Sequence, residues 1–212
     1  VDTANISYNL NEYARAGIGG VEITPIYGVQ GNDKNDIPYL SPKWMKMLAH
    51  VETTGTATGI ETNMSTGTGW PFGGPLVSVD DAAAKAIFQQ YDVDVTKKGQ
   101  TLNVACTDAK QRKFARLDKV MAYKLSKGGN KKVVDLTFAT DKATGEVSLA
   151  ALGKGKWHIV ALHIGRTRQM VKRAAPGGEG YVIDHFNRDA VSRYLARFDT
   201  AFVNQGVRPP HT

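Results

Sequence analysis

The 212-residue chain has a single cysteine, Cys106, and no long apolar segment. One thiol excludes a disulfide within the chain and a metal site built from several cysteines. Because Cys106 lies in a strand-like segment, we expect it to be buried and structural. No apolar run approaches the roughly 18 residues that would cross a bilayer, so we expect no membrane span. The chain begins with Val1 and no signal peptide follows, which indicates a processed or excised protein.

The phosphate-binding loop of nucleotide enzymes is also missing. Residues 67–74 contain four glycines but no Gly-Lys-Ser/Thr sequence, and no lysine lies between Lys46 and Lys85. This composition argues against nucleotide binding. No group of His, Cys and Asp has the spacing of a zinc site. The residues by themselves therefore indicate no metal site and no cofactor.

The net charge of +7 is unevenly distributed along the chain. Eleven Lys and Arg lie between Lys97 and Lys132, against only Asp108 and Asp118. A basic face of this kind attracts nucleic acid or acidic polymers. However, neither interleaved aromatic residues nor a recognition-helix pattern accompanies it. We therefore favour a solvated face and expect no nucleic-acid partner, while an anionic polysaccharide remains compatible.

Residues 1–87 and 166–212 both alternate helical patterns with short buried strands. Ser41 and Pro42 have the cap and first-position preferences of a helix start. That helix should weaken over residues 53–58, where Thr and Gly are poor helix formers. Alternation of this kind, with short connections, predicts an α/β fold with a parallel sheet or barrel. We expect strands at 20–25, 60–64 and 180–184, and helices at 5–16, from Ser41, from Ser78, and from Asn187.

Residues 88–165 have a different pattern, in which short period-2 strands alternate with turn signals. Six strands within fewer than 80 residues favour a small all-β sandwich inserted into the α/β part. Trp157 falls within one of these strands and is expected in the core. The strands are expected at 91–95, 101–106, 120–125, 132–139, 146–151 and 156–164, with one of the turns at 127–130.

Residues 63–75 form the most informative stretch, Asn-Met-Ser-Thr-Gly-Thr-Gly-Trp-Pro-Phe-Gly-Gly-Pro, here named the Trp70 loop. Its glycines let the backbone lie close to a ligand, while its prolines stiffen it. An aromatic face beside hydroxyl groups suits a sugar ring. The same aromatic residues could instead plug the end of a barrel or sheet. The candidate sugar contacts are Asn63, Ser65, Thr66 and Trp70.

Four segments together resemble glycoside hydrolase family 106, the α-L-rhamnosidase-like enzymes, and related bacterial glycosidases. They are residues 16–25 (Ala-Gly-Ile-Gly-Gly-Val-Glu-Ile-Thr-Pro), 39–44 (Tyr-Leu-Ser-Pro-Lys-Trp), 65–75 and 172–186. The resemblance implies a TIM-type (β/α) barrel. A whole barrel needs about 250 residues, and only three candidate barrel strands are visible, so we expect a partial barrel.

The resemblance also implies a function. It implies paired-carboxylate hydrolysis of plant-type polysaccharides or oligosaccharides, calcium in some members, and a periplasmic or secreted location. The chain ends before the acidic motif in which the family has a catalytic glutamate. We therefore expect the N-terminal part of such a hydrolase. The alternative is a carbohydrate-binding or structural module that has no turnover because the second carboxylate is missing.

Glycosidic cleavage needs two carboxyl groups beside the scissile bond, and barrel enzymes collect such groups at the carboxyl ends of strands. Asp184 and Glu22 are the candidate catalytic carboxylates. Glu22 could instead organise the barrel mouth by hydrogen bonding, and Asp184 could instead cap the following helix or pair with an arginine. His185 could bind a sugar hydroxyl or be satisfied structurally. Lys172, on the strength of the resemblance, is a further candidate contact.

Overall fold

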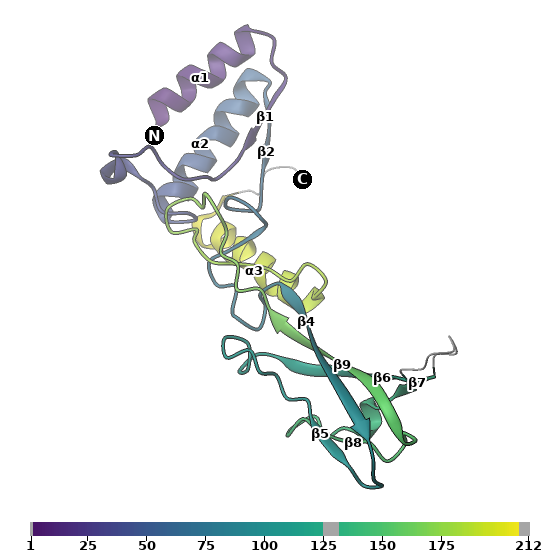
Figure 1. Cartoon of the computed structure of the whole chain (residues 1–212). Helices are drawn as coiled ribbons and strands as arrows, with labels where there is room; N and C mark the ends of the chain where they lie inside the picture. The colour runs from purple at the N-terminus through teal and green to yellow at the C-terminus, as the bar shows by residue number, and fades with distance from the viewer. Residues whose placement is uncertain (1, 125–131, 208–212) are drawn as a thin grey trace. The chain divides into compact units, whose positions relative to one another are not determined.

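The structure is a computed structural model that describes residues 2–124 and 132–207 (Figure 1). The chain forms two compact units, Val1–Ala83 with Arg168–Thr212, and Ala84–Thr167. The second unit thus interrupts the first in sequence. The turn expected at 127–130 lies outside the described residues.

The first unit begins with two helices and a pair of parallel strands: α1 (Thr3–Arg15), β1 (Gly20–Ile23), α2 (Pro42–Thr58) and β2 (Glu61–Met64), with the short 3₁₀ turn η1 (Asp33–Asn35) after β1. Asp2 caps α1 by accepting the backbone N–H of Asn5, and Ser41 accepts that of Trp44 at the start of α2. β1 and β2 are parallel, with Gly20 opposite Glu61 and Ile23 opposite Met64. The expected helix–strand alternation is therefore confirmed over residues 3–64.

The weakening expected at the end of α2 is wrong. The helix runs to Thr58 and ends at Gly59 in a left-handed conformation. Thr53 and Thr58 donate their hydroxyls to the carbonyls four residues earlier, at 2.9 and 2.8 Å. Gly55 is needed for packing, since a Cβ there would lie 2.9 Å from the carbonyl oxygen of Ile60. Tertiary contact with β2 therefore outweighs the poor helix propensity of these residues.

Two expectations for later elements are also wrong. The strand expected at 180–184 is β10 (Tyr181–Val182), and it pairs antiparallel with β3 (Gly73–Gly74) rather than parallel with β1 or β2. The helix expected from Ser78 is a single turn, in which the Ser78 hydroxyl accepts the Asp81 N–H at 3.1 Å. The chain then becomes extended, because the Ala83 N–H donates to the Val182 carbonyl at 2.8 Å. In the described part of the chain these small sheets form no closed barrel.

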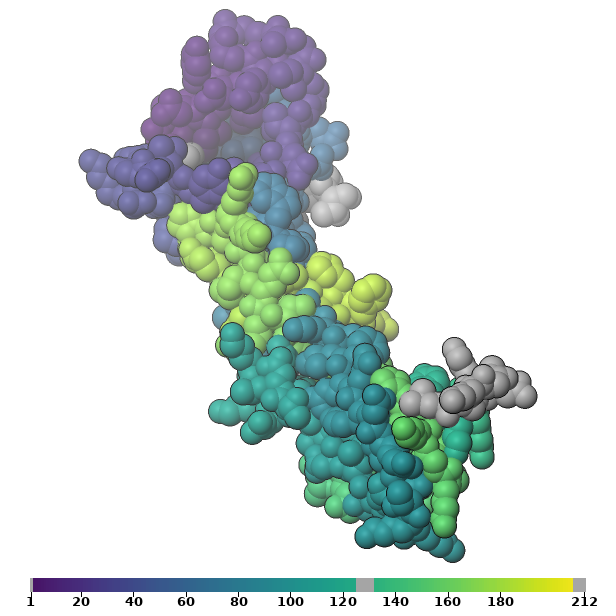
Figure 2. Space-filling view, in the orientation of Figure 1, coloured from purple at the N-terminus to yellow at the C-terminus, as the bar shows by residue number. Residues whose placement is uncertain are grey.

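The second unit consists of β4 (Ala84–Val95), β5 (Thr101–Asn103), β6 (Arg116–Lys124), β7 (Val133–Asp135), the 3₁₀ turn η2 (Thr137–Ala139), β8 (Glu146–Ser148) and β9 (Gly155–Arg166). β4, β9, β6 and β7 form an antiparallel sheet in that order, and β5 pairs with β8. Each of the six expected ranges thus contains a strand, although β5, β7 and β8 are shorter than the ranges expected at 101–106, 132–139 and 146–151. Figure 2 shows the teal side chains of β4 beside the green ones of β9 on the surface of this unit.

The core of the second unit contains Trp157, which is 1% exposed and donates its indole N–H to the Gly153 carbonyl at 2.8 Å. Cys106 is also buried, as expected. The buried core residues are Val95, Val104, Leu117, Val120, Ala122, Leu136, Val147, Leu149, Leu152, Trp157, Ile159 and Ala161.

Helix α3 (Arg188–Gln205) completes the first unit and holds the Trp70 loop. Asn187 caps it, as expected, by accepting the Ala190 N–H at 3.2 Å. The buried Tyr194 hydroxyl lies 3.0 Å from the Thr66 carbonyl and 2.8 Å from the Gly73 carbonyl. Burial raises the pKa of Tyr194 to about 12, so its hydroxyl stays a neutral donor.

Two arginines of α3 extend this contact. The Arg193 guanidinium donates two hydrogen bonds to the Asp81 carboxylate, from Nη2 to Oδ1 at 2.5 Å and from Nε to Oδ2 at 3.3 Å. This two-pronged geometry fixes the orientation of both groups. Arg197 donates to the Pro75 carbonyl. Residues 66–81 are therefore anchored to a helix more than 100 positions away in sequence.

Replacing the Tyr194 hydroxyl tests this anchor. Tyr194→Phe keeps the ring contacts with Phe72 and Phe198 but leaves buried carbonyls without their donor. We expect the free energy of unfolding to fall by about 1–3 kcal/mol. Urea unfolding followed by circular dichroism at 222 nm measures it, since the described helices all belong to the first unit. Tyr8→Phe, at an exposed tyrosine, is the matched control, and an equal small effect of both variants would contradict the anchor.

A second prediction concerns the close approach of the loop to β10. A Cβ on Gly73 would collide with the carbonyl oxygen of Tyr181, whereas a Cβ on Gly19 would meet nothing within 4 Å. We expect Gly73→Ala to destabilise the first unit by about 2 kcal/mol or more through overpacking. Gly19→Ala should change stability by less than about 0.5 kcal/mol. Thermal unfolding of the two variants side by side measures the difference, and a Gly73→Ala protein as stable as the control would refute the packing.

Candidate functional site

One face of the β1–β2 pair is polar and open. Thr62 of β2 donates its hydroxyl to Glu52 on α2, so that side chain faces the helix. Side chains alternate along a strand, so Asn63 lies on the opposite face. Glu22 is its partner in the register of β1 and β2, and both are exposed. The structure therefore brings together two of the predicted site residues, Glu22 and Asn63.

The chain segments after β1 and β2 meet the segment before β10. The Ser65 N–H donates to the Ile23 carbonyl at 3.0 Å, and the Gly69 N–H donates to the Pro25 carbonyl at 3.2 Å. Trp70 and Lys172 exchange both backbone hydrogen bonds, at 2.9 and 2.6 Å. Trp70 and Lys172, both predicted as sugar contacts, are thus neighbours through their backbones.

A buried threonine fixes the same junction from inside. The Thr68 hydroxyl accepts the Ala175 N–H at 2.8 Å, and Thr68 is fully buried. A Cβ on Gly69 would collide with the Lys172 carbonyl, and Gly69 also has a φ of +80°. This glycine is therefore required both for its conformation and for the approach of Lys172.

The two aromatic residues of the Trp70 loop have separate roles. Phe72 packs inward, with its ring centroid 5.1 Å from that of Tyr194 on α3. Trp70 is 52% exposed and presents ring surface to solvent. The two alternatives open from the sequence, an internal plug and an exposed aromatic wall, are thus divided between Phe72 and Trp70.

Ser65 and Thr66 are half-buried and partly occupied by local hydrogen bonds. The Ser65 hydroxyl accepts the Gly67 N–H at 3.4 Å, and the Thr66 carbonyl accepts from Tyr194. The Thr66 carbonyl is thus part of the anchor to α3, whereas the Thr66 side chain could contact a ligand without disturbing that anchor.

Asp184 lies in the turn between β10 and α3. Its Oδ1 accepts the Phe186 N–H at 3.1 Å, its backbone N–H donates to the Asp81 carbonyl at 2.8 Å, and its carbonyl accepts from Asn187. The exposed His185 follows, with its ring centroid 5.8 Å from that of Phe72. Glu22 lies in β1, which pairs parallel with β2, whereas Asp184 follows β10, which pairs antiparallel with β3 in a separate sheet.

Three further residues of this region were not among the site residues predicted from the sequence. Arg173 places its guanidinium 5.8 Å from the centre of the Tyr27 ring, and the Tyr27 N–H donates to the Arg173 carbonyl at 3.1 Å. Phe186 is fully exposed immediately after His185. The basic pair at 172–173 was a usable signal for Arg173. Tyr27 and Phe186 lie in loops with no pattern that marks them.

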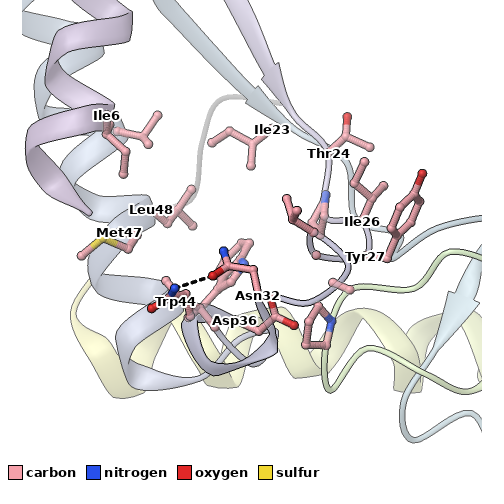
Figure 3. A pocket seen from close by; sticks show the side chains of 18 residues that line it. Ile6, Ile23, Thr24, Ile26, Tyr27, Asn32, Asp36, Trp44, Met47 and Leu48 are labelled. Atoms are coloured by element: carbon pink, nitrogen blue, oxygen red, sulfur yellow. Dashed lines mark hydrogen bonds between the residues drawn. The ribbon is translucent and has the colours of Figure 1, made fainter. Parts of the chain in front are cut away.

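A cavity of about 460 Å³ lies on the helix side of β1. Figure 3 shows Ile23, Leu48 and Trp44 on its apolar walls, with Asn32 and Asp36 at one end. The Asn35 amide donates to Asn32 at 2.5 Å. None of the predicted site residues lines this cavity. Its walls suit an apolar group better than a sugar ring.

Among the described residues there is no group of three or more His, Cys, Asp or Glu side chains that could hold a metal ion. Calcium, expected for some members of the resembled family, would have to rely on other oxygen ligands. Over residues 2–124 and 132–207, no helix combines the length and apolar character needed to cross a membrane.

Comparison with known proteins identifies a relative in fold. No protein-family model and no curated protein matches the chain. Among solved structures, a rhamnosidase from Novosphingobium sp. PP1Y matches with a TM-score of 0.63 and 13% sequence identity. The alignment covers 97% of this chain and 35% of that one, so this chain spans about a third of the rhamnosidase. At this identity the likeness is one of fold alone.

Proposed function

We propose that this chain is part of a glycosidase-like protein and that it binds a saccharide at the Trp70 loop. The observation that carries the proposal is the half-exposed indole of Trp70 on a rigidly held loop. A sugar ring stacks its C–H face on such a ring, while neighbouring polar groups bind its hydroxyls. Lys172 lies beside Trp70 through backbone pairing, and Arg173 follows it in sequence. The fold relationship to a rhamnosidase favours a saccharide as the ligand.

The finer proposal is membership of the α-L-rhamnosidase-like enzymes of glycoside hydrolase family 106. In it, β1 and β2 with α1 and α2 are the first units of a TIM-type barrel. The polar face that carries Glu22 and Asn63 then corresponds to the interior of the barrel. A periplasmic or secreted location, a calcium requirement in the whole protein, and the absence of nucleic-acid and membrane partners rest on sequence reasoning and remain part of the proposal.

In this proposal Asp184 and Glu22 are the catalytic carboxylates, and His185 binds a hydroxyl of the substrate. One carboxylate protonates the leaving oxygen while the other acts on the anomeric centre or on water. Stacking of the sugar ring on Trp70 would hold the substrate in one orientation, which favours reaction at the glycosidic bond.

The second candidate is saccharide binding without hydrolysis. It is favoured by the hydrogen bond that Asp184 Oδ1 accepts from the Phe186 N–H, because this bond gives the carboxylate a structural role in the turn before α3. It is also favoured by the placement of Glu22 in the β1–β2 sheet and of Asp184 after β10, a strand of a separate sheet. The two candidates share the Trp70 surface and differ only in turnover.

Removal of the indole tests the binding surface. We expect Trp70→Ala to weaken binding of L-rhamnose or a rhamnose-containing oligosaccharide at least ~10-fold, which corresponds to about 1.4 kcal/mol. Phe138→Ala, at a 97% exposed aromatic residue of the second unit, is the control and should leave affinity unchanged. Isothermal titration measures both variants, and equal affinities would exclude Trp70 from the binding surface.

Turnover separates the two candidate functions. Asp184→Asn keeps an oxygen that can accept the Phe186 N–H, so we expect the fold and the saccharide affinity to be retained. If Asp184 is catalytic, hydrolysis of an aryl α-L-rhamnoside should fall by more than ~100-fold, as for loss of a general acid–base group. Release of the aryl group, measured by absorbance, reports the rate. Saccharide binding by the wild-type chain without any aryl release would contradict catalysis by Asp184 and Glu22 within this chain and would favour the non-hydrolytic candidate for it.

A further inference from the structure

A separate cavity of about 420 Å³ lies within the second unit. Its walls come from the chain after β5, from the segment before and into β6, from the turn before β8, and from β9. The volume falls within the range of small-molecule sites in proteins. The polar and sulfur-containing side chains on its walls are Asn103, Cys106, Thr107, Arg112, Lys142 and His163.

His163 is the unusual member of this set. It lies on β9 in the inward-facing row that includes Trp157, Ile159 and Ala161, and it is 2% exposed. Neither of its ring nitrogens has a partner among the described residues at hydrogen-bonding distance and angle, although the Val104 backbone lies near enough to favour the protonated ring. A buried polar group left in this state lowers stability. Such a group calls for an explanation, and a ligand in the cavity that it lines supplies one.

Other buried polar groups of this unit are satisfied, which makes His163 an exception. Gln111 donates its amide to the Arg166 carbonyl at 2.8 Å and accepts the Arg166 N–H at 3.0 Å. The Thr137 hydroxyl accepts the Val120 N–H at 3.1 Å. Among the described residues of this unit, Gln111 and Thr137 thus have partners at hydrogen-bonding geometry, whereas the His163 ring nitrogens do not.

The protonation state of His163 suits an uncharged contact. Burial lowers the pKa of His163 below its usual range, and the Val104 backbone opposes that shift only in part. At neutral pH the ring is therefore neutral, with one nitrogen that donates and one that accepts. It can contact hydroxyl or carbonyl groups of a ligand at the inner end of the cavity.

Positive charge surrounds the same cavity. Arg112 and Lys142 are exposed lining residues, and the lining contains no acidic side chain. Among the described residues neither is in an ion pair. The nearest acids in sequence are occupied by backbone N–H groups, Asp108 by that of Lys110 and Asp141 by that of Ala143, at 2.9 and 2.8 Å.

The charge of the whole unit acts in the same direction. Residues 84–167 contain 16 Lys and Arg and 7 Asp and Glu, a net charge of +9. The remaining residues contain 11 basic and 13 acidic side chains, a net charge of −2. The excess charge of the protein is therefore carried by the unit that holds the cavity, and the field of such a unit attracts anions.

We propose that this cavity binds a compact small molecule that carries a carboxylate or phosphate group. Arg112 and Lys142 contact the oxyanion at the rim, and the uncharged part of the ligand reaches His163 and lies against Cys106. The site is distinct from the Trp70 surface and does not depend on the saccharide proposal.

Binding to the full chain tests this site with glucuronate and inorganic phosphate as probes and glucose as the neutral comparison. We expect glucuronate or phosphate, but not glucose, to bind in isothermal titration, and the probe that binds identifies the oxyanion. Bound glucuronate, whose uncharged ring reaches the inner wall, should also slow alkylation of Cys106, the single thiol of the chain, by iodoacetamide at least ~5-fold. Absence of binding by both anions, or binding of glucuronate without protection of Cys106, would overturn the proposal.

Single substitutions distinguish a specific binding site from general electrostatic attraction. Arg112→Gln should weaken binding at least ~10-fold, whereas Lys113→Gln removes the same charge one position away, outside the lining, and should change affinity less than ~2-fold. Equal losses would show general electrostatics and refute the site.

His163→Leu should weaken binding without lowering thermal stability, because it removes an unpaired buried polar group. Trp70→Ala should leave anion binding unchanged, so failure of the saccharide proposal remains distinguishable.

Discussion

The contact between α3 and the Trp70 loop is the interaction on which the candidate saccharide site depends. The Tyr194 hydroxyl serves two loop carbonyls, Arg193 meets Asp81, and Arg197 reaches the Pro75 carbonyl. These partners lie on opposite sides of the inserted unit in sequence. A loop rich in glycine has high conformational entropy when free. Its fixed shape therefore comes from partners supplied by the C-terminal helix.

That anchor explains how one loop combines burial with exposure. Phe72 contributes its ring to the cluster around Tyr194, and the glycines at 73 and 74 allow β10 to pair at close range. Trp70 precedes these contacts, its backbone pairs with that of Lys172, and half of the residue remains exposed. A rigid backbone with an exposed aromatic ring lowers the entropy lost on ligand binding.

The two units differ in the chemistry that they offer. The first unit has polar and aromatic groups around the ends of β1 and β2, with a net charge near zero. The second has a strongly basic surface and a cavity where a buried imidazole meets two exposed cations. The two proposed sites therefore belong to different units, the saccharide surface to the first and the anion cavity to the second. The basic cluster between Lys97 and Lys132, read from the sequence as a solvated face, thus includes Arg112 of the proposed anion site.

Local features of the sequence determined the parts of the fold that depend on neighbouring residues. Ser41 with Pro42 and Asn187 marked two helix starts, and period-2 patterns marked the six strands of the second unit, because caps and alternation act within a few positions. The same reasoning identified Trp70 as a candidate contact and Trp157 and Cys106 as buried. Only the tertiary structure decided the features that rest on distant partners. These are the continuation of α2 through Thr58, the antiparallel pairing of β10 with Gly73–Gly74, the extended chain after Ser78, and the unpaired ring of His163. Each depends on which distant residues folding brings together or leaves unpaired. Local sequence patterns do not contain that information.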